Sequence, residues 1–297
     1  MILNIKDLSV RYKKSTKNVL NNINLQIEEH SIVSIVGHNG AGKSSLINAI
    51  MKNLTYKGSV EYGFPEKDLY KLVRVQSQTS TFETKAKVKD ILKLYINILG
   101  EELSVNELLE SVEMTDFKNS YIEKLSGGEK QKIAVLLATI GSPKLIILDE
   151  LTTGLDVMSR RMIWDLLNKI RKEKQATILL TSHFLDEVEY LSDQVIVIEH
   201  GKVILTGSPS DIIYKAFQGK KQASCLVDAN FHFTGLKYPY TQIDNKILIA
   251  YHNDQEHDIF EHMRICGGFD LQMKSHTFED AFLKIVGYQL NEEGEVI

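Results

Sequence analysis

A glycine-rich stretch, Gly37-His38-Asn39-Gly40-Ala41-Gly42-Lys43-Ser44, constrains the fold more than any other part of the chain. It follows an apolar run at residues 31–36, typical of a β-strand, and opens into the helical pattern of residues 45–50. The spacing G-x-x-x-x-G-K-[ST] between a strand and a helix is that of a phosphate-binding loop. Its glycines permit a tight turn whose backbone N–H groups face phosphate oxygens, beside the positive end of the helix. We therefore predict an α/β nucleotide-binding fold in which Lys43 reaches the β/γ-phosphates and Ser44 is a ligand of Mg²⁺.

Composition restricts the possible partners. The 297-residue chain has 35 Lys and Arg residues against 39 Asp and Glu residues, a net charge of −4, so it has no general basic field for nucleic acid. No segment reaches the ~18 uninterrupted apolar residues that span a bilayer, and the N-terminus lacks the pattern of a signal peptide. We expect a soluble protein whose membrane role, if any, comes through a partner. Cys225 and Cys266 lack metal-ligand spacing, and we expect both to be reduced thiols.

Two apolar runs end in side chains suited to phosphoryl transfer. Residues 144–148 precede Asp149 and Glu150, and residues 177–182 precede His183. Continuous apolar runs are typical of parallel strands buried on both faces, and ligands of such folds bind beyond the carboxyl ends of the strands. One carboxylate for a metal and one for a water molecule would supply what phosphoryl transfer requires.

The alternation of strands and helices predicts an α/β protein with a largely parallel sheet. Strands are expected at residues 2–5, 8–12 and 23–27, and helical spacing recurs at 88–99, 101–112 and 130–140. The sequence pattern changes near residues 207–210. After this point the expected strands (223–227, 246–251) and helices (255–265, 277–287) are short. We predict a nucleotide-binding domain at 1–210, with an antiparallel N-terminal β subdomain and a helical insertion at about 79–140, followed by a small α+β domain at 211–297.

The segment Leu125-Ser126-Gly127-Gly128-Glu129-Lys130-Gln131, here called the signature segment, reads L-S-G-G-x-x-Q some twenty residues before Asp149. With the phosphate loop and the Asp149-Glu150 pair, it resembles the nucleotide-binding subunit of an ABC transporter. The resemblance implies an ATPase that uses Mg²⁺, in which Asp149 assists the metal directly or through water. It also implies that Glu150 polarises the attacking water and that His183 contacts the γ-phosphate. The positions that it implies for nucleotide binding are Tyr12, Gly37, His38, Asn39, Gly40, Ala41, Gly42, Lys43, Ser44, Ser45, Ser126, Gly127, Gly128 and Asp156.

Several positions leave alternatives open. An aromatic residue at a strand end, such as Tyr12, usually packs, whereas the resemblance implies that its ring stacks on adenine. The glutamine that senses Mg²⁺ is either Gln76 or Gln78, and counting ten residues back from Val88 favours Gln78. Leu151 stands where proline usually follows the catalytic glutamate, which leaves that turn less constrained.

The resemblance also implies partners. In the family Ser126 and Gly128 close over the γ-phosphate held by a second subunit, so we expect a homodimer with two ATP molecules between its subunits. A separate transmembrane permease would place the chain at the cytoplasmic face of the plasma membrane. Residues 277–287 are similar to the ending of bacterial exporter ATPases that pair with a six-helix permease, which favours export of a peptide, antibiotic, lipid or similar substrate. The alternatives are an importer, a ribosome- or DNA-associated ATPase, and an ATP-binding immunity or regulatory subunit.

Overall fold

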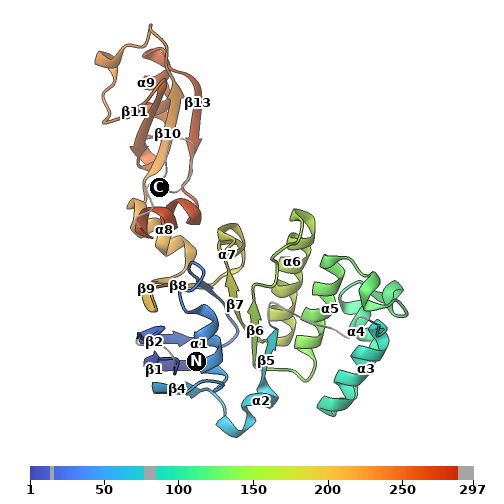
Figure 1. Ribbon diagram of the computed structural model, residues 1–297. Helices are drawn as coiled ribbons and strands as arrows, with labels where there is room; N and C mark the ends of the chain where they lie inside the picture. The colour runs from blue at the N-terminus through green and yellow to red at the C-terminus, as the bar shows by residue number, and fades with distance from the viewer. Residues whose placement is uncertain (14–16, 77–84, 287–297) are drawn as a thin grey trace. The chain divides into compact units, whose positions relative to one another are not determined.

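The computed structural model describes residues 1–13, 17–76 and 85–286 (Figure 1). The chain divides into two compact units, Met1–Gly207 and Ser208–Ile297, close to the boundary expected at residue 210. Among the described residues, no helix combines the length and apolar character that crossing a bilayer requires.

The first unit is built on a sheet with the strand order β5-β6-β7-β3-β8-β9. Its strands pair in parallel, except that β9 runs antiparallel to β8. The apolar run of β6 is buried on both faces, because Leu145 and Ile147 belong to one core cluster and Ile146 and Leu148 to the other. The strands are β3 (Ile32–Val36), β5 (Val73–Gln76), β6 (Leu145–Asp149), β7 (Thr177–Ser182), β8 (Gln194–Glu199) and β9 (Lys202–Gly207).

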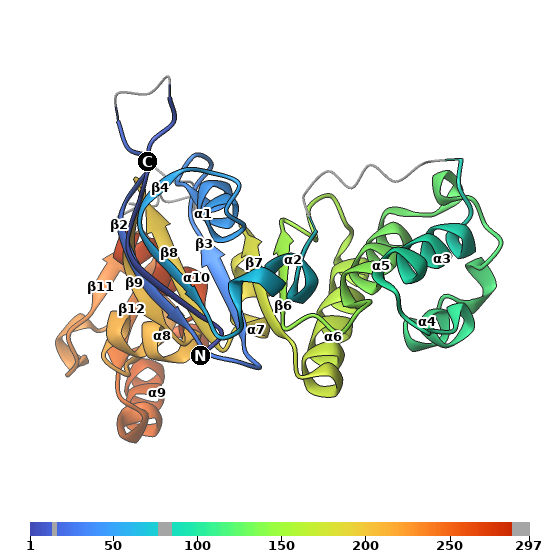
Figure 2. The ribbon, with the colours of Figure 1, turned by 90° about the horizontal axis from the view of Figure 1, so that it is seen from below.

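An antiparallel sheet of order β2-β1-β4 shares a core with one face of this parallel sheet and with α1 (Lys43–Ile50) (Figure 2). This arrangement confirms the predicted β subdomain. The two strands expected within residues 2–12 form one strand, because the register shift beside Asp7, whose φ is 52°, interrupts the pairing without ending it. The strands are β1 (Leu3–Val10), β2 (Leu20–Ile27) and β4 (Tyr56–Tyr62).

Helices pack on the other face of the parallel sheet. α5 (Gly127–Thr139) and α6 (Val157–Lys174) bury their apolar residues there, and α3 (Val88–Leu99) and α4 (Val105–Ser111) extend the same cluster. The helix expected from residue 101 begins only at Val105, because Gly100 ends α3 in a left-handed conformation and Ser104 is the N-cap of α4. The shorter helices of this unit are Glu66–Asp68, α2 (Leu69–Leu72), Thr115–Phe117, Ile122–Lys124 and α7 (Leu185–Leu191).

The second unit is an antiparallel sheet of order β11-β12-β10-β13 with helices α8, α9 and α10. Its core contains Cys225 and Cys266, both buried free thiols. The strands are β10 (Lys221–Leu226), β11 (Thr241–Ile243), β12 (Lys246–Tyr251) and β13 (Phe269–Lys274). The helices are α8 (Pro209–Phe217), Phe233–Gly235, Asn253–Gln255, α9 (Glu256–Ile265) and α10 (Phe278–Val286).

Candidate active site

The phosphate loop connects β3 to α1, as the sequence predicts. Gly40 and Gly42 have φ values of 84° and 112°, in the left-handed region that favours glycine. A Cβ atom on Gly42 would also lie 2.6 Å from Cδ2 of Leu20, and one on Gly37 would lie 2.2 Å from the carbonyl oxygen of Ile198. The loop therefore requires glycine for two reasons, the backbone conformation and the close approach of neighbouring strands.

Lys43, the first residue of α1, is 6% exposed. Its Nζ donates hydrogen bonds to the carbonyl oxygens of Gly37 (2.6 Å) and His38 (3.3 Å), so the side chain lies back along the loop. Burial lowers the pKa of Lys43, while the nearby carboxylates of Glu150 and Asp149 act to raise it. The site thus places one ammonium group beside two carboxylates in a partly desolvated position.

A cavity of about 360 Å³ opens beside the loop. Lys43, Ser44 and Glu150 reach it together, although Glu150 is distant from the loop in sequence. Phosphate-loop groups and a strand-end carboxylate therefore face one space. The full lining is Val19, Asn39, Gly40, Gly42, Lys43, Ser44, Ser45 and Glu150.

Thr181 fixes the two carboxylate-bearing residues at the end of β6. It is in register with Asp149, and its hydroxyl donates to Oδ1 of Asp149 (2.5 Å). The backbone N–H of Glu150 donates to the hydroxyl (3.0 Å) and carbonyl (3.2 Å) oxygens of Thr181. Glu150 has a φ of 51°, which turns the chain sharply, and Leu151 is buried in the helical core. The burial of Leu151 anchors the turn at the position where related chains usually have proline. The role of Thr181 follows from the register between β6 and β7, which the sequence alone does not reveal.

His183 lies just beyond β7. Its Nδ1 is 3.9 Å from Oε1 of Glu150, and 42% of its side chain is exposed, against 15% for Glu150. The imidazole is therefore the more exposed member of this pair, and in the described structure it does not line the cavity at the phosphate loop.

Mg²⁺ binds oxygen ligands and usually retains waters and substrate phosphates. The Ser44 hydroxyl and the Asp149 carboxylate are oxygen donors of this kind. The described part of the chain has no group of three or more His, Cys, Asp or Glu side chains that could hold a metal ion by themselves. Gln76 is the last residue of β5 and pairs with Leu148, the neighbour of Asp149. Gln78 lies outside the described residues.

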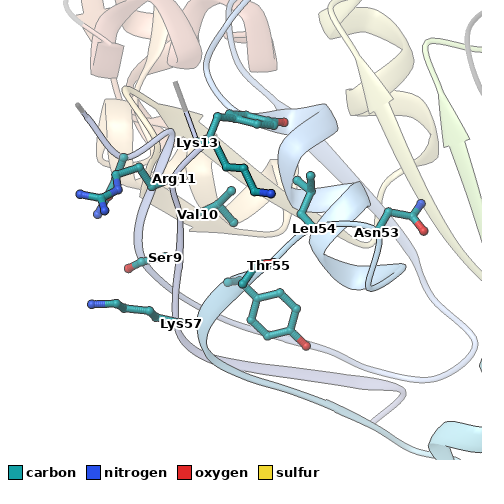
Figure 3. Close-up of a pocket in the computed structure, with 11 residues that line it drawn as sticks. Ser9, Val10, Arg11, Lys13, Asn53, Leu54, Thr55 and Lys57 are labelled. Carbon is teal, nitrogen blue, oxygen red and sulfur yellow. The ribbon is translucent and has the colours of Figure 1, made fainter. Parts of the chain in front are cut away.

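Tyr12 lies two residues beyond the end of β1 and is partly exposed. Its hydroxyl is 3.1 Å from that of Ser45, so the ring lies beside the start of α1. Tyr12 also lines a separate hollow of about 650 Å³, in which Figure 3 shows Val10, Lys13 and Leu54. Neither Lys43 nor Glu150 lines that hollow, whereas both line the cavity at the phosphate loop.

The signature segment and Asp156 form a second group at the N-termini of α5 and α6. Ser126 and Glu129 make a capping box, with the Ser126 N–H donating to Glu129 (2.7 Å) and the Glu129 N–H donating to Ser126 (3.3 Å). Asp156 caps α6 by accepting from the N–H (2.9 Å) and hydroxyl (2.6 Å) of Ser159. A Cβ atom on Gly128 would lie 2.7 Å from Oγ of Ser159, so the two caps are adjacent. In the described structure, this group does not line the cavity at the phosphate loop.

The fold and the site define a phosphate-loop ATPase with a helical insertion, and comparisons identify its family. The family model described as "ABC transporter" matches residues 20–153. The energy-coupling factor transporter ATP-binding protein EcfA of Pediococcus pentosaceus is 35% identical over 71% of this chain and 80% of its own length. The chain belongs to the family of ABC transporter ATPases, which bind ATP with Mg²⁺ and hydrolyse it.

Other relatives have different named roles. The Nod factor export ATP-binding protein I of Rhizobium etli is 28% identical over 98% of this chain and 95% of its own length. The methionine import ATP-binding protein MetN of Haemophilus ducreyi is 32% identical over 78% of this chain and 72% of its own. ATP-binding cassette sub-family A member 2 of Homo sapiens is 33% identical, and the chain spans only 9% of its length.

A solved structure agrees with the fold. CbiO1 from Clostridium perfringens, described as part of the ABC transporter complex cbiONQ, matches with a TM-score of 0.64 and 27% identity. The match covers 73% of this chain and 94% of that structure.

Proposed function

We propose that Glu150 polarises the water that attacks the γ-phosphate of ATP in the cavity at the phosphate loop. The observation that carries this proposal is that Glu150 and Lys43 line one cavity, with the backbone of Glu150 held by Thr181. Phosphoryl transfer depends mainly on positioning and on neutralised charge. Lys43 and the loop N–H groups would hold the phosphates, and His183 would contact the γ-phosphate from the exposed side of Glu150.

The remaining roles in nucleotide binding belong to residues in and around this cavity. Ser44 and Asp149 would hold Mg²⁺, with Gln78 as the further ligand. The bound ion would neutralise phosphate charge and so favour attack by water. Tyr12, beside Ser45, would stack on the adenine ring.

The signature segment would act on ATP held by a second copy. Ser126 and Gly128 lie at the N-terminus of α5, which favours an anion, yet they do not line the cavity of their own chain in the described structure. A head-to-tail dimer would bring this helix end to the partner's γ-phosphate and would create two composite sites.

We further propose that the dimer drives export through a separate transmembrane permease. The Nod factor export protein, which matches this chain along nearly its whole length, supports that direction, as does the similarity of residues 277–287 to exporter ATPases. Closure of two ATPase subunits on ATP would shift the permease between its conformations.

The substitution Glu150→Gln tests the catalytic proposal, because the amide keeps the size of the side chain but loses its charge. We expect kcat to fall by roughly 100-fold or more while ATP binding persists. Steady-state phosphate release and equilibrium binding of ATP would be measured on the same preparations. Turnover equal to that of the unmodified chain would remove Glu150 from this role.

The direction of transport requires the membrane partner. Co-purification from detergent-solubilised membranes would identify it, and the complex would then be reconstituted in vesicles with the ATPase outside. An exporter would move its substrate into these vesicles on addition of ATP, because their interior corresponds to the far side of the membrane. ATP-dependent release from preloaded vesicles would instead indicate an importer.

A further inference from the structure

Glu187, on α7, carries a carboxylate in the interior of the first unit. The residue is 4% exposed. Its Oε1 accepts hydrogen bonds from Oγ1 of Thr152 (2.9 Å) and from Nε1 of Trp164 (2.8 Å). The Ser182 hydroxyl, which accepts from the N–H of Phe184 (3.0 Å), also acts to lower the pKa of this carboxylate. One buried acidic group therefore accepts from the loop after Glu150 and from α6, beside the end of β7.

These donors flank residues of the proposed active site. Thr152 follows Glu150 by two positions, in the loop that leads to Asp156. Ser182 is the last residue of β7 and immediately precedes His183. Trp164 belongs to α6, which Asp156 caps. The Glu187 carboxylate thus joins the chain just after Glu150 to α6, beside the residue that precedes His183.

Placing a carboxylate in the protein interior costs free energy. Burial raises the pKa of Glu187, because desolvation disfavours the charged form, while the bonds from Ser182, Thr152 and Trp164 act in the opposite direction. A buried polar group costs free energy unless it is hydrogen-bonded, and an apolar residue would avoid that cost. The arrangement of donors indicates that the group fixes the geometry of these loops.

We propose that Glu187 is a positioning residue that holds the loop after Glu150 through Thr152 and so keeps Glu150 and the neighbouring His183 in their working geometry. This inference rests on the roles proposed above for Glu150 and His183. Glu187 does not line the phosphate-loop cavity in the described structure, so it acts on turnover and leaves the binding surface for the phosphates unchanged. Loop displacements of about 1 Å can reduce turnover by roughly 100-fold.

The test compares four single variants of the full chain, and one double variant, with Mg²⁺ and ATP. Glu187→Ala removes the acceptor, and Thr152→Val removes one donor at nearly constant shape. Glu187→Gln keeps an oxygen that can accept from Thr152 and Trp164, with an amide that can donate to Ser182. The matched control is Tyr190→Phe on the same helix, which removes the bond from the Tyr190 hydroxyl to Asp165 near the surface (3.1 Å). The measurements are kcat, KM, ATP-binding stoichiometry and the unfolding midpoint.

We expect Glu187→Ala to lower kcat roughly 10- to 100-fold with KM within about twofold of the unmodified value. Glu187→Gln is expected to retain kcat within about threefold, and Tyr190→Phe to leave it unchanged. Thr152→Val should lower kcat less than Glu187→Ala, and adding it to Glu187→Ala should have little further effect, because both act through one contact.

Two outcomes separate this inference from the proposed function. A lower unfolding midpoint for Glu187→Ala with an unchanged kcat per ATP-binding site would show that the residue only stabilises the fold, and would overturn the inference. Full turnover in Glu150→Gln, assayed in parallel, would instead overturn the catalytic role on which the inference rests. Loss of turnover in Glu150→Gln together with the kcat-specific loss in Glu187→Ala supports both.

Discussion

At the residue scale, the Thr181 hydroxyl connects both members of the Asp149-Glu150 pair to strand β7. In Thr181→Val the side chain keeps its shape, but the Asp149 carboxylate loses a donor and the Glu150 N–H loses one of its acceptors. We expect kcat to fall roughly 10-fold or more, since the strand end would no longer be held at the working geometry. The measurement is steady-state phosphate release at saturating Mg²⁺ and ATP.

A matched control lies on the same strand. The Thr177 hydroxyl is also buried in β7, where it accepts from the N–H of His30 (2.9 Å), but it lies at the opposite end of the strand from Thr181. Thr177→Val should lower the unfolding midpoint without lowering kcat. Equal losses of kcat in the two variants would show that Thr181 acts only through strand stability.

Two roles of Tyr12, stacking on adenine and bonding to Ser45, are separable because the ring and the hydroxyl make different contacts. If the ring stacks on adenine, Tyr12→Phe keeps most of the ATP affinity and Tyr12→Ala loses about 1–3 kcal/mol of binding free energy. If Tyr12 acts mainly through its bond to Ser45, both substitutions weaken binding equally. Equilibrium titration of each variant with ATP and with inorganic triphosphate checks this. Only ATP binding should respond to the loss of the ring.

At the element scale, α5 begins with a cap that has two possible functions. Ser126 satisfies the N–H of Glu129, and its position at the helix end also suits a phosphate of a partner's ATP. The substitution Ser126→Asp separates the capping function from the phosphate contact, because aspartate is an equally good N-cap but adds a negative charge. We expect the unfolding midpoint to stay nearly constant while ATP hydrolysis falls roughly 100-fold through repulsion of the γ-phosphate.

Ser208, which caps α8 by accepting from the N–H of Asp211 (3.1 Å), provides the control. Ser208→Asp should change neither stability nor hydrolysis appreciably. Full activity in Ser126→Asp would exclude Ser126 from contact with a nucleotide phosphate.

The elements that carry the site were predictable because their signals are local. The glycine spacing of residues 37–44 and the apolar run before Asp149 each determine a strand end without reference to the rest of the chain. Thr181 and Glu187 were missed because their roles depend on the register of β6 with β7 and on the packing of α6 against α7. Strand β13 (Phe269–Lys274) was missed although its sequence alternates strictly between apolar and polar residues, a pattern that predicts a strand.

At the scale of the whole molecule, the proposed dimer implies that the active site would be incomplete in one copy. The phosphate-loop cavity holds Lys43 and Glu150, whereas Ser126 and Asp156 belong to the separate group at the starts of α5 and α6. In a two-fold symmetric dimer, the phosphate-loop cavity of each copy could face the starts of α5 and α6 of the other copy. Two complete sites would then form at once. Affinity for a second copy should therefore depend on ATP, which contributes contacts to both subunits only in the closed dimer.

Mixing two inactive variants tests this shared site directly. Lys43→Ala destroys the phosphate loop of one copy, and Ser126→Asp destroys the signature segment of another. In a mixed dimer, one site combines the intact phosphate loop of the Ser126→Asp copy with the intact signature segment of the Lys43→Ala copy. Random pairing at equal concentrations gives mixed dimers in about half of the population, so about a quarter of all sites should be intact. Phosphate release from the mixture should then exceed the sum of the two variants measured separately, and it should rise with total protein concentration. Release no greater than that sum, in a mixture shown by light scattering to form dimers with ATP, would mean that each copy hydrolyses ATP within its own chain.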